Sequence, residues 1–289
     1  MTPAPRIVTT VALEQLEVVV GRCAENRSAA LNRTRQAFAA GADIVVLPEL
    51  AISGYVIEPD LAQRWAEPLD GPSVTAFREL AAANAGLVIF GFCERAGEDV
   101  FNSVVAVGPD GVVLHYRKLH LFDKEKGVYA PGNLGLPVVR TRFGDIGVCI
   151  CYDLRFVEVM RILALRGADL VIAPAAWVAG FDRSVPASGR TGHAESLLVQ
   201  ANLNQVAAVA VSQVAGSSQH RPPTLGGSVA CDAYGQVLAG PLSRAQADSA
   251  LVTVDLCAVR EARRRSDTIR PREDRRTDVY SLEYLGARR

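Results

Sequence analysis

Three short apolar runs in this chain end abruptly in a polar or reactive side chain. They are Asp43–Glu49, Val112–Lys118 and Asp145–Cys151, and they close on a carboxylate, an ammonium and a thiol. Apolar, β-branched runs of this length that stop at a polar segment are typical of buried strands. Pro48 also stops the hydrogen-bonded ladder of the first run. The pattern therefore predicts three strands, the one before Cys151 buried, that deliver chemistry to their ends.

Helical and strand-like segments alternate along the rest of the chain. Helical spacing lies within Asn26–Ala40 and follows the third run over Val157–Arg166. Further strands are expected at Leu87–Phe92 and, on either side of a Gly-Pro-Asp-Gly turn, at Ser103–Val107 and Val112–Tyr116. No segment reads as a linker or an internal repeat. We expect one α/β domain with mixed sheets over residues 1–289, with a C-terminal extension from about residue 260.

The three strand ends are expected to share one site. Open α/β sheets bind ligands beyond the carboxyl ends of their strands. Cys151 precedes a helical segment, where backbone N–H groups and the helix dipole favour a thiolate. Taken alone, Glu49 and Lys118 could be isolated charges or helix caps, and Cys151 could be a structural thiol. Their joint placement favours a common site with a cysteine nucleophile.

Composition excludes several classes of protein. The 289 residues are 49% hydrophobic and 21% charged with a formal net charge of zero, which is typical of a globular protein and not of a general nucleic-acid binder. No apolar run reaches the ~18 residues of a membrane span, and the first residues lack the apolar core of a signal peptide. The six cysteines show no metal-type spacing, and no phosphate-cradling glycine motif is present. We expect a cytoplasmic protein without a metal or organic cofactor.

Three sequence blocks carry a family resemblance. LPELAISGY around Glu49, YRKLHLF around Lys118 and GVCICYDLRF around Cys151 resemble, in order and spacing, the catalytic blocks of the nitrilase (carbon–nitrogen hydrolase) superfamily. The resemblance runs from Arg6 to about Tyr284. Two late blocks belong to it, GGSVACDAYGQVLA (226–239) and DRRTDVY (274–280). It implies a four-layer α-β-β-α sandwich.

The resemblance also implies roles for individual residues. Cys151 would be the nucleophile that forms a thioester, and Glu49 the base that takes its proton and later activates water. Lys118 and the backbone N–H of Tyr152 would stabilise the oxyanion. Glu125 stands six residues before a Pro-Gly pair, where the family often has a second glutamate that positions the lysine and the substrate nitrogen. The alternative is that Glu125 is a solvated loop charge.

Four further residues are candidates for substrate contact. Tyr55, Phe122, Arg155 and Trp177 follow the catalytic blocks or strand ends. Aromatic residues at such positions also serve as core or rim packing. Arg155 could bind a substrate carboxylate through two hydrogen bonds. It could equally pair with a structural carboxylate close to it in the sequence.

The residues after Cys151 bear on the reaction class. Nitrilases usually carry Trp-Glu there, whereas Tyr152-Asp153 resembles the amidase and carbamoylase branches, and HLFD (120–123) looks closest to ω-amidases. The prediction is hydrolysis of a small linear amide. The alternatives are an N-carbamoyl amidohydrolase, a nitrilase or a noncatalytic small-molecule-binding relative.

The C-terminal region is rich in arginine. Residues 260–276 hold eight arginines and four acidic residues. Aromatic residues are absent from this stretch, so ion pairs with a partner subunit or a solvated extension are favoured over a nucleic-acid patch. In relatives the C-terminal segment reaches across to another subunit, which implies a homodimer or a higher homo-oligomer.

Overall fold

Two six-stranded mixed sheets form the centre of the molecule. The computed structural model describes residues 7–178, 191–215 and 223–287. The first sheet has the order β14 (Asp248–Asp255), β1 (Val8–Gln15), β2 (Ile44–Val46), β3 (Leu87–Ala96), β4 (Asp99–Gly108), β5 (Gly111–Arg117). The second has the order β13 (Val237–Ala239), β12 (Val229–Cys231), β9 (Ala207–Ser212), β8 (Leu170–Ala175), β7 (Gly144–Val148), β6 (Val138–Thr141). A small ladder joins β10 (Val214–Ala215) and β11 (Thr224–Leu225).

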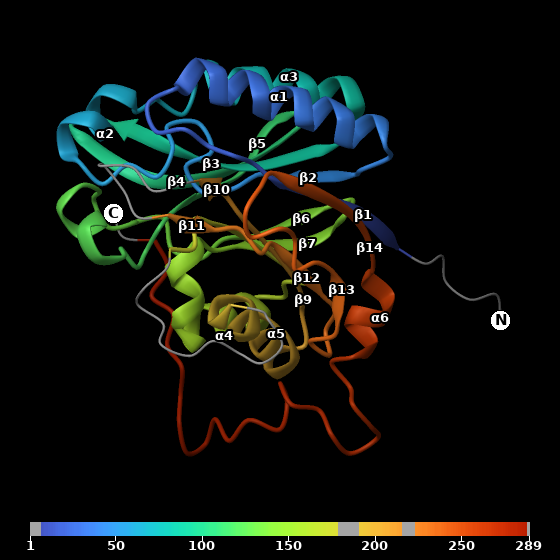
Figure 1. The fold of residues 1–289 in the computed structure, drawn as a ribbon. Helices are drawn as coiled ribbons and strands as arrows, with labels where there is room; N and C mark the ends of the chain where they lie inside the picture. Colours follow the sequence, from blue (N-terminus) through green and yellow to red (C-terminus); the bar gives the residue numbers. More distant parts are fainter. Residues whose placement is uncertain (1–6, 179–190, 216–222, 288–289) are drawn as a thin grey trace.

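Helices cover the outer face of each sheet. Figure 1 shows α1 (Cys23–Ala39) and α3 (Pro72–Asn84) over the first sheet, and α4 (Val157–Leu165) and α5 (Gly192–Asn204) over the second. The order of layers is therefore α-β-β-α, and the predicted four-layer sandwich is confirmed. The remaining helices are α2 (Pro59–Trp65), α6 (Leu256–Glu261) and the 3-10 helices η1 (Asp123–Gly127) and η2 (Cys151–Arg155). No helix in the described part of the chain is long and apolar enough to cross a membrane.

Alternation along the strands builds two cores. On β1, Val11 and Leu13 pack in the cluster that lies between the sheets, together with Val148 of β7. Ala12, which points to the other face, packs with Phe38 of α1 in the cluster beneath the helices. Successive side chains of a strand face opposite sides, so one strand can serve both cores. Nearly continuous apolar runs are the sequence signature of strands covered on both faces.

Strand β3 is longer than its apolar pattern predicts. β4 pairs with β5 as expected, but β3 continues past Phe92 to Ala96. The extension contains Glu94, which is 2% exposed. Burial opposes the charge of Glu94, but hydrogen bonds from His115 and Arg117 outweigh it and lower the pKa of this carboxyl to about 2. The apolar pattern did not predict this extension, because the residues that bind the buried Glu94 carboxylate lie on β5.

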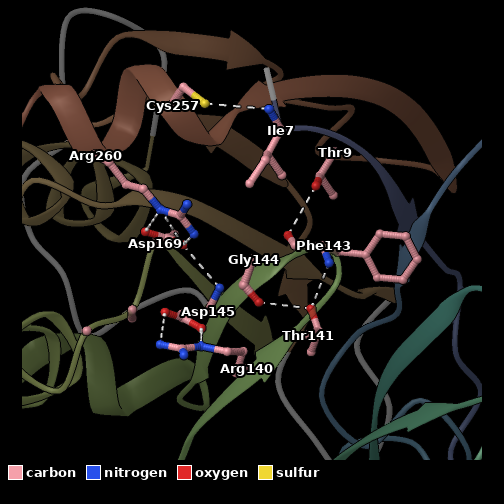
Figure 2. A network of polar contacts seen from close by, with 12 residues as sticks. Ile7, Thr9, Arg140, Thr141, Phe143, Gly144, Asp145, Asp169, Cys257 and Arg260 are labelled. Atoms are coloured by element: carbon pink, nitrogen blue, oxygen red, sulfur yellow. Dashed lines mark hydrogen bonds and ion pairs between the residues drawn. The ribbon is translucent and has the colours of Figure 1, made fainter. Parts of the chain in front are cut away.

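The arginines near the C-terminus bind their own chain. Arg260 and Arg263 donate to the buried carboxylate of Asp169 at 2.7 and 2.6 Å, and Figure 2 shows Arg260 in this network beside Asp145. Arg272 donates to the carbonyl oxygen of Asn204 at the end of α5, at 2.8 Å. Basic side chains stabilise the last carbonyls of helices in this way. Contacts within the chain therefore engage these three arginines, a role that the sequence did not predict.

The Asp169 network yields a stability prediction. Asp169→Asn removes the charge that Arg260 and Arg263 share, and we expect the free energy of unfolding to fall by about 1–3 kcal/mol. Chemical denaturation measures this difference. The control is Arg140→Ala, because the Arg140–Asp145 pair has an arginine side chain that is 88% exposed, and we expect no measurable change. Equal effects of the two substitutions would contradict the role given to Asp169.

Candidate active site

Three segments bring two carboxylates to one buried lysine. Glu49 follows β2, Lys118 follows β5, and Glu125 lies in η1. The Lys118 Nζ lies 2.7 Å from the Glu49 Oε1 and 2.9 Å from the Glu125 carboxylate, and the three side chains are inaccessible to solvent. Burial alone would lower the pKa of Lys118, but the carboxylates of Glu125 and Glu49 outweigh it and raise that pKa. The lysine is therefore held as an ammonium.

Glycines allow the backbone to place these residues. A Cβ on Gly91 of β3 would lie 2.6 Å from the Glu49 Cα, which real Cβ atoms essentially never do. A Cβ on Gly132 would overlap the carbonyl oxygen of Arg117, and the Gly132 N–H donates to the Lys118 carbonyl at 2.8 Å. The Pro-Gly pair after Glu125 thus packs directly against the backbone of the lysine.

Asn102 of β4 links the two glutamates. Its Nδ2 donates to the Oε1 atoms of Glu49 and Glu125 at 2.7 and 3.3 Å, and its carbonyl accepts from the Lys118 N–H at 2.9 Å. Sequence reasoning missed this residue. The signal was the polar pair Asn102-Ser103 inside the otherwise apolar run 100–107. The Oε2 of Glu49 is buried and has no hydrogen-bond partner among the described residues, so one carboxylate oxygen remains available to accept a proton.

Cys151 begins η2 in a left-handed backbone conformation, with φ 45°. The strand ladder ends at Val148, and the five residues of η2, of which Cys151 is the first, precede α4. Burial and the Glu49 carboxylate raise the pKa of the Cys151 thiol well above its usual value, against the opposing effects of Lys118 and the Ala176 N–H. Burial therefore outweighs any contribution of this turn towards a thiolate. The resting group is a thiol that needs a base.

A small cavity opens at Cys151. Its lining comprises Tyr55, Phe122, Cys151, Tyr152, Ala176, Val178 and His193. Tyr55 and Phe122 thus lie where substrate contact was expected. Burial, reinforced by the charge of Glu125, raises the pKa of Tyr55 well above its usual value, so this hydroxyl stays neutral.

The other two substrate-contact candidates lie outside this lining. Trp177 is fully buried and stacks on His193 with ring centroids 5.4 Å apart and the planes inclined at 23°. His193 itself lines the cavity, which the sequence did not suggest. Arg155 is an exposed residue of η2. The structure thus brings together Glu49, Lys118, Glu125 and the Cys151 pocket, but it sets Arg155 and Trp177 apart from the cavity wall.

The arrangement has the parts that nucleophilic attack on a carbonyl group requires. A thiol borders a cavity, a buried carboxylate offers an unoccupied oxygen, and an ammonium supplies positive charge. No group of three or more His, Cys, Asp or Glu side chains in the described part of the chain could hold a metal ion. Fold and site define a hydrolase that uses a cysteine nucleophile. The family model for carbon-nitrogen hydrolases matches residues 10–264, and the chain belongs to this family.

Individual relatives agree with the family. The chain is 34% identical to the (R)-stereoselective amidase of Pseudomonas sp, over 84% of this chain and 85% of the relative. It is 31% identical to omega-amidase NIT2 of Homo sapiens, over 94% and 96% of the two chains. With several other curated relatives the match spans just over half of the relative's length. The carbon-nitrogen hydrolase of Helicobacter pylori G27 shares the fold, with a TM-score of 0.83, 24% identity, and coverage of 95% and 97%.

Proposed function

We propose that this protein hydrolyses a small linear amide through a thioester on Cys151. The observation that carries the proposal is the buried Lys118 between two carboxylates, next to a cavity that Cys151 lines. Similarity to an (R)-stereoselective amidase and to an omega-amidase over most of their length supports the same reaction.

The first half of the reaction forms the thioester. The free Oε2 of Glu49 takes the thiol proton, and the Cys151 sulfur attacks the amide carbon while the C=O electron pair moves to oxygen. Lys118 has three N–H donors, two of which the glutamates engage, so the third can stabilise the oxyanion together with the Tyr152 backbone N–H. The oxyanion then collapses, the C–N bond breaks, and the departing nitrogen takes the proton from Glu49. Glu125 holds Lys118 and orients that nitrogen.

The second half regenerates the thiol. A water molecule enters where the amine or ammonia has left, and Glu49 removes its proton as the oxygen attacks the thioester carbon. The same donors stabilise the second oxyanion. Its collapse breaks the C–S bond, the sulfur takes the proton from Glu49, and the carboxylic acid leaves. One carboxylate therefore acts as base and then as acid in each half.

The substrate is an amide and not a nitrile. We expect kcat/KM for an amide to exceed that for the nitrile with the same acyl group by at least ~10-fold, or about 1.4 kcal/mol in barrier. The reason is the Tyr152-Asp153 pair after the nucleophile, which resembles the amidase branches, together with the similarity to two amidases over most of their length. Paired steady-state assays on one acyl series, with ammonia release as the readout, measure the ratio. A nitrile that reacts faster than its amide would refute the amidase assignment.

The same assay tests the alternative function, an N-carbamoyl amidohydrolase, and the acyl group of the substrate. An N-carbamoyl amino acid that reacts faster than every simple amide would favour the carbamoyl amidohydrolase. The described cavity wall is mostly aromatic and aliphatic, which suits a neutral acyl group. An acyl group ending in a carboxylate would need a cation, and Arg155→Ala with succinamate and butyramide as paired substrates tests whether Arg155 supplies it.

We further propose that the chain acts as one domain in a cytoplasmic homodimer or larger homo-oligomer. Several apolar side chains on α4 and α5 are exposed: Val157 at 64%, Val199 at 56% and Leu203 at 55%. Exposed apolar groups that gather on one face are typical of surfaces that bind another protein. Sedimentation velocity would give the mass in solution.

A further inference from the structure

A buried carboxylate ties the turn of Cys151 to the segment of Lys118. Asp153 is the second residue after Cys151 and is inaccessible to solvent. Its Oδ2 accepts from the Tyr116 hydroxyl at 2.7 Å, and its Oδ1 lies 2.8 Å from the His120 Nδ1 and accepts from the His120 N–H at 3.1 Å. We call these three residues, Asp153, Tyr116 and His120, the Asp153 tether.

The tether brackets the lysine. Tyr116 and His120 stand two residues before and two residues after Lys118, and both bind Asp153. Lys118 itself directs its Nζ to the glutamates. Tyr116 belongs to β5 of the first sheet, whereas η2 follows β7 of the second sheet. The tether therefore joins the two sheets at the point where each one delivers a reacting group.

Asp153 also fixes the conformation of the turn. Its Oδ2 accepts from the Ile150 N–H at 2.9 Å, and its own N–H donates to the Ile150 carbonyl at 2.9 Å. Between these two residues Cys151 adopts the left-handed backbone. A non-glycine residue holds such a conformation only where its surroundings impose it. His120 adds a packing contact, because its ring stacks on Phe156 just beyond η2 with centroids 3.6 Å apart.

We infer that the Asp153 tether sets the position of the Cys151 sulfur relative to the Lys118 ammonium, so that Tyr116, His120 and Asp153 are positioning residues for the reaction. The inference rests on the proposed function, in which Cys151 attacks and Lys118 stabilises the oxyanion. Displacements of about 1 Å at a reacting centre can cost 10²-fold in rate. The tether acts on geometry and touches no substrate, so its loss lowers kcat and leaves KM nearly unchanged.

Two substitutions test this. Tyr116→Phe keeps the buried ring and deletes the hydroxyl that donates to Asp153 and accepts from the Leu119 N–H. His120→Phe keeps a ring to stack on Phe156 and deletes the side-chain donor. We expect each to lower kcat about tenfold with KM within about twofold of the wild type. The rate at which iodoacetamide alkylates Cys151 falls in the same proportion, since Glu49 then reaches the thiol less well.

The matched control is Thr9→Val. The Thr9 hydroxyl is also buried, and it donates to the Phe143 carbonyl at 3.1 Å in the region drawn in Figure 2, away from the pocket. We expect a similar loss in thermal midpoint but kcat within about twofold of the wild type. If Tyr116→Phe and His120→Phe behave like Thr9→Val, the tether only supports the fold and the inference is overturned. If Tyr116→Phe does not fold, His120→Phe still carries the test, because the His120 side chain is 32% exposed and tolerates change.

The two proposals fail in different ways. Turnover that survives Cys151→Ala would overturn the proposed function. A dead Cys151→Ala enzyme together with unchanged kcat and alkylation rate in Tyr116→Phe and His120→Phe would overturn the tether alone.

Discussion

Cys151→Ala is expected to reduce amide turnover by at least ~10⁴-fold. Loss of a nucleophile removes the covalent route, and the residual rate then comes only from binding and from the oxyanion donors. The substitution deletes a single sulfur at the edge of a cavity, so the fold should persist. Ammonia release measures turnover, and circular dichroism checks the fold. In the wild-type protein, mass spectrometry after rapid quenching should find the acyl group on the peptide that contains Cys151.

Cys149→Ala is the control for this experiment. Cys149 is fully buried, and burial raises the pKa of its thiol well above the usual value, so it has neither access nor a thiolate. We expect Cys149→Ala to retain most of the wild-type kcat. An acyl adduct on Cys149, or a Cys151→Ala enzyme with near-normal turnover, would refute Cys151 as the nucleophile.

The fold was largely predictable because its strands are covered on both faces. Such strands leave continuous apolar runs, and the runs before Glu49 and Cys151 were placed correctly as strands. The errors lie where a polar residue finds its partner far away in the sequence. The extension of β3 past Phe92 contains Glu94, whose carboxylate binds Arg117 and His115 of β5. A local pattern carries no information about such a partner.

The sequence pointed to the candidate residues of the site and not to its electrostatics. Strand ends and the family blocks pointed to Glu49, Lys118, Glu125 and Cys151, which the structure places around one buried centre and its cavity. Burial raises the pKa of the Cys151 thiol and outweighs what the turn at η2 contributes towards a thiolate, and the sequence does not show how deep this turn lies. Asn102 was missed because one residue inside an apolar strand shows neither its depth nor the two carboxylates that it faces.

Lys118→Met is expected to have two large and separable effects. Without the ammonium, kcat should fall ~10²–10³-fold, the range for loss of an oxyanion donor. Stability should fall by about 3–5 kcal/mol, because the substitution leaves the carboxylates of Glu49 and Glu125 buried without their counter-ion. Steady-state kinetics and chemical denaturation measure the two effects.

The stability of Lys118→Met is expected to depend on pH in a defined direction. Burial already raises the pKa of Glu125, and Lys118 opposes that rise. Removing the lysine raises the pKa further above its unfolded value, so the folded variant binds protons more tightly than the unfolded chain. Its stability relative to the wild type therefore improves as the pH falls and worsens as the pH rises through the raised pKa.

A double substitution separates charge from chemistry. Glu125→Gln in the Lys118→Met background removes one of the two unpaired carboxylates and keeps the shape of the side chain. We expect it to recover part of the lost stability, to flatten the pH dependence of unfolding, and to leave kcat as low as in Lys118→Met. Recovery of kcat along with stability would mean that Lys118 serves only to neutralise the glutamates, and the oxyanion role would be lost. If Lys118→Met alone leaves the free energy of unfolding unchanged, the two glutamates do not depend on Lys118 for their burial.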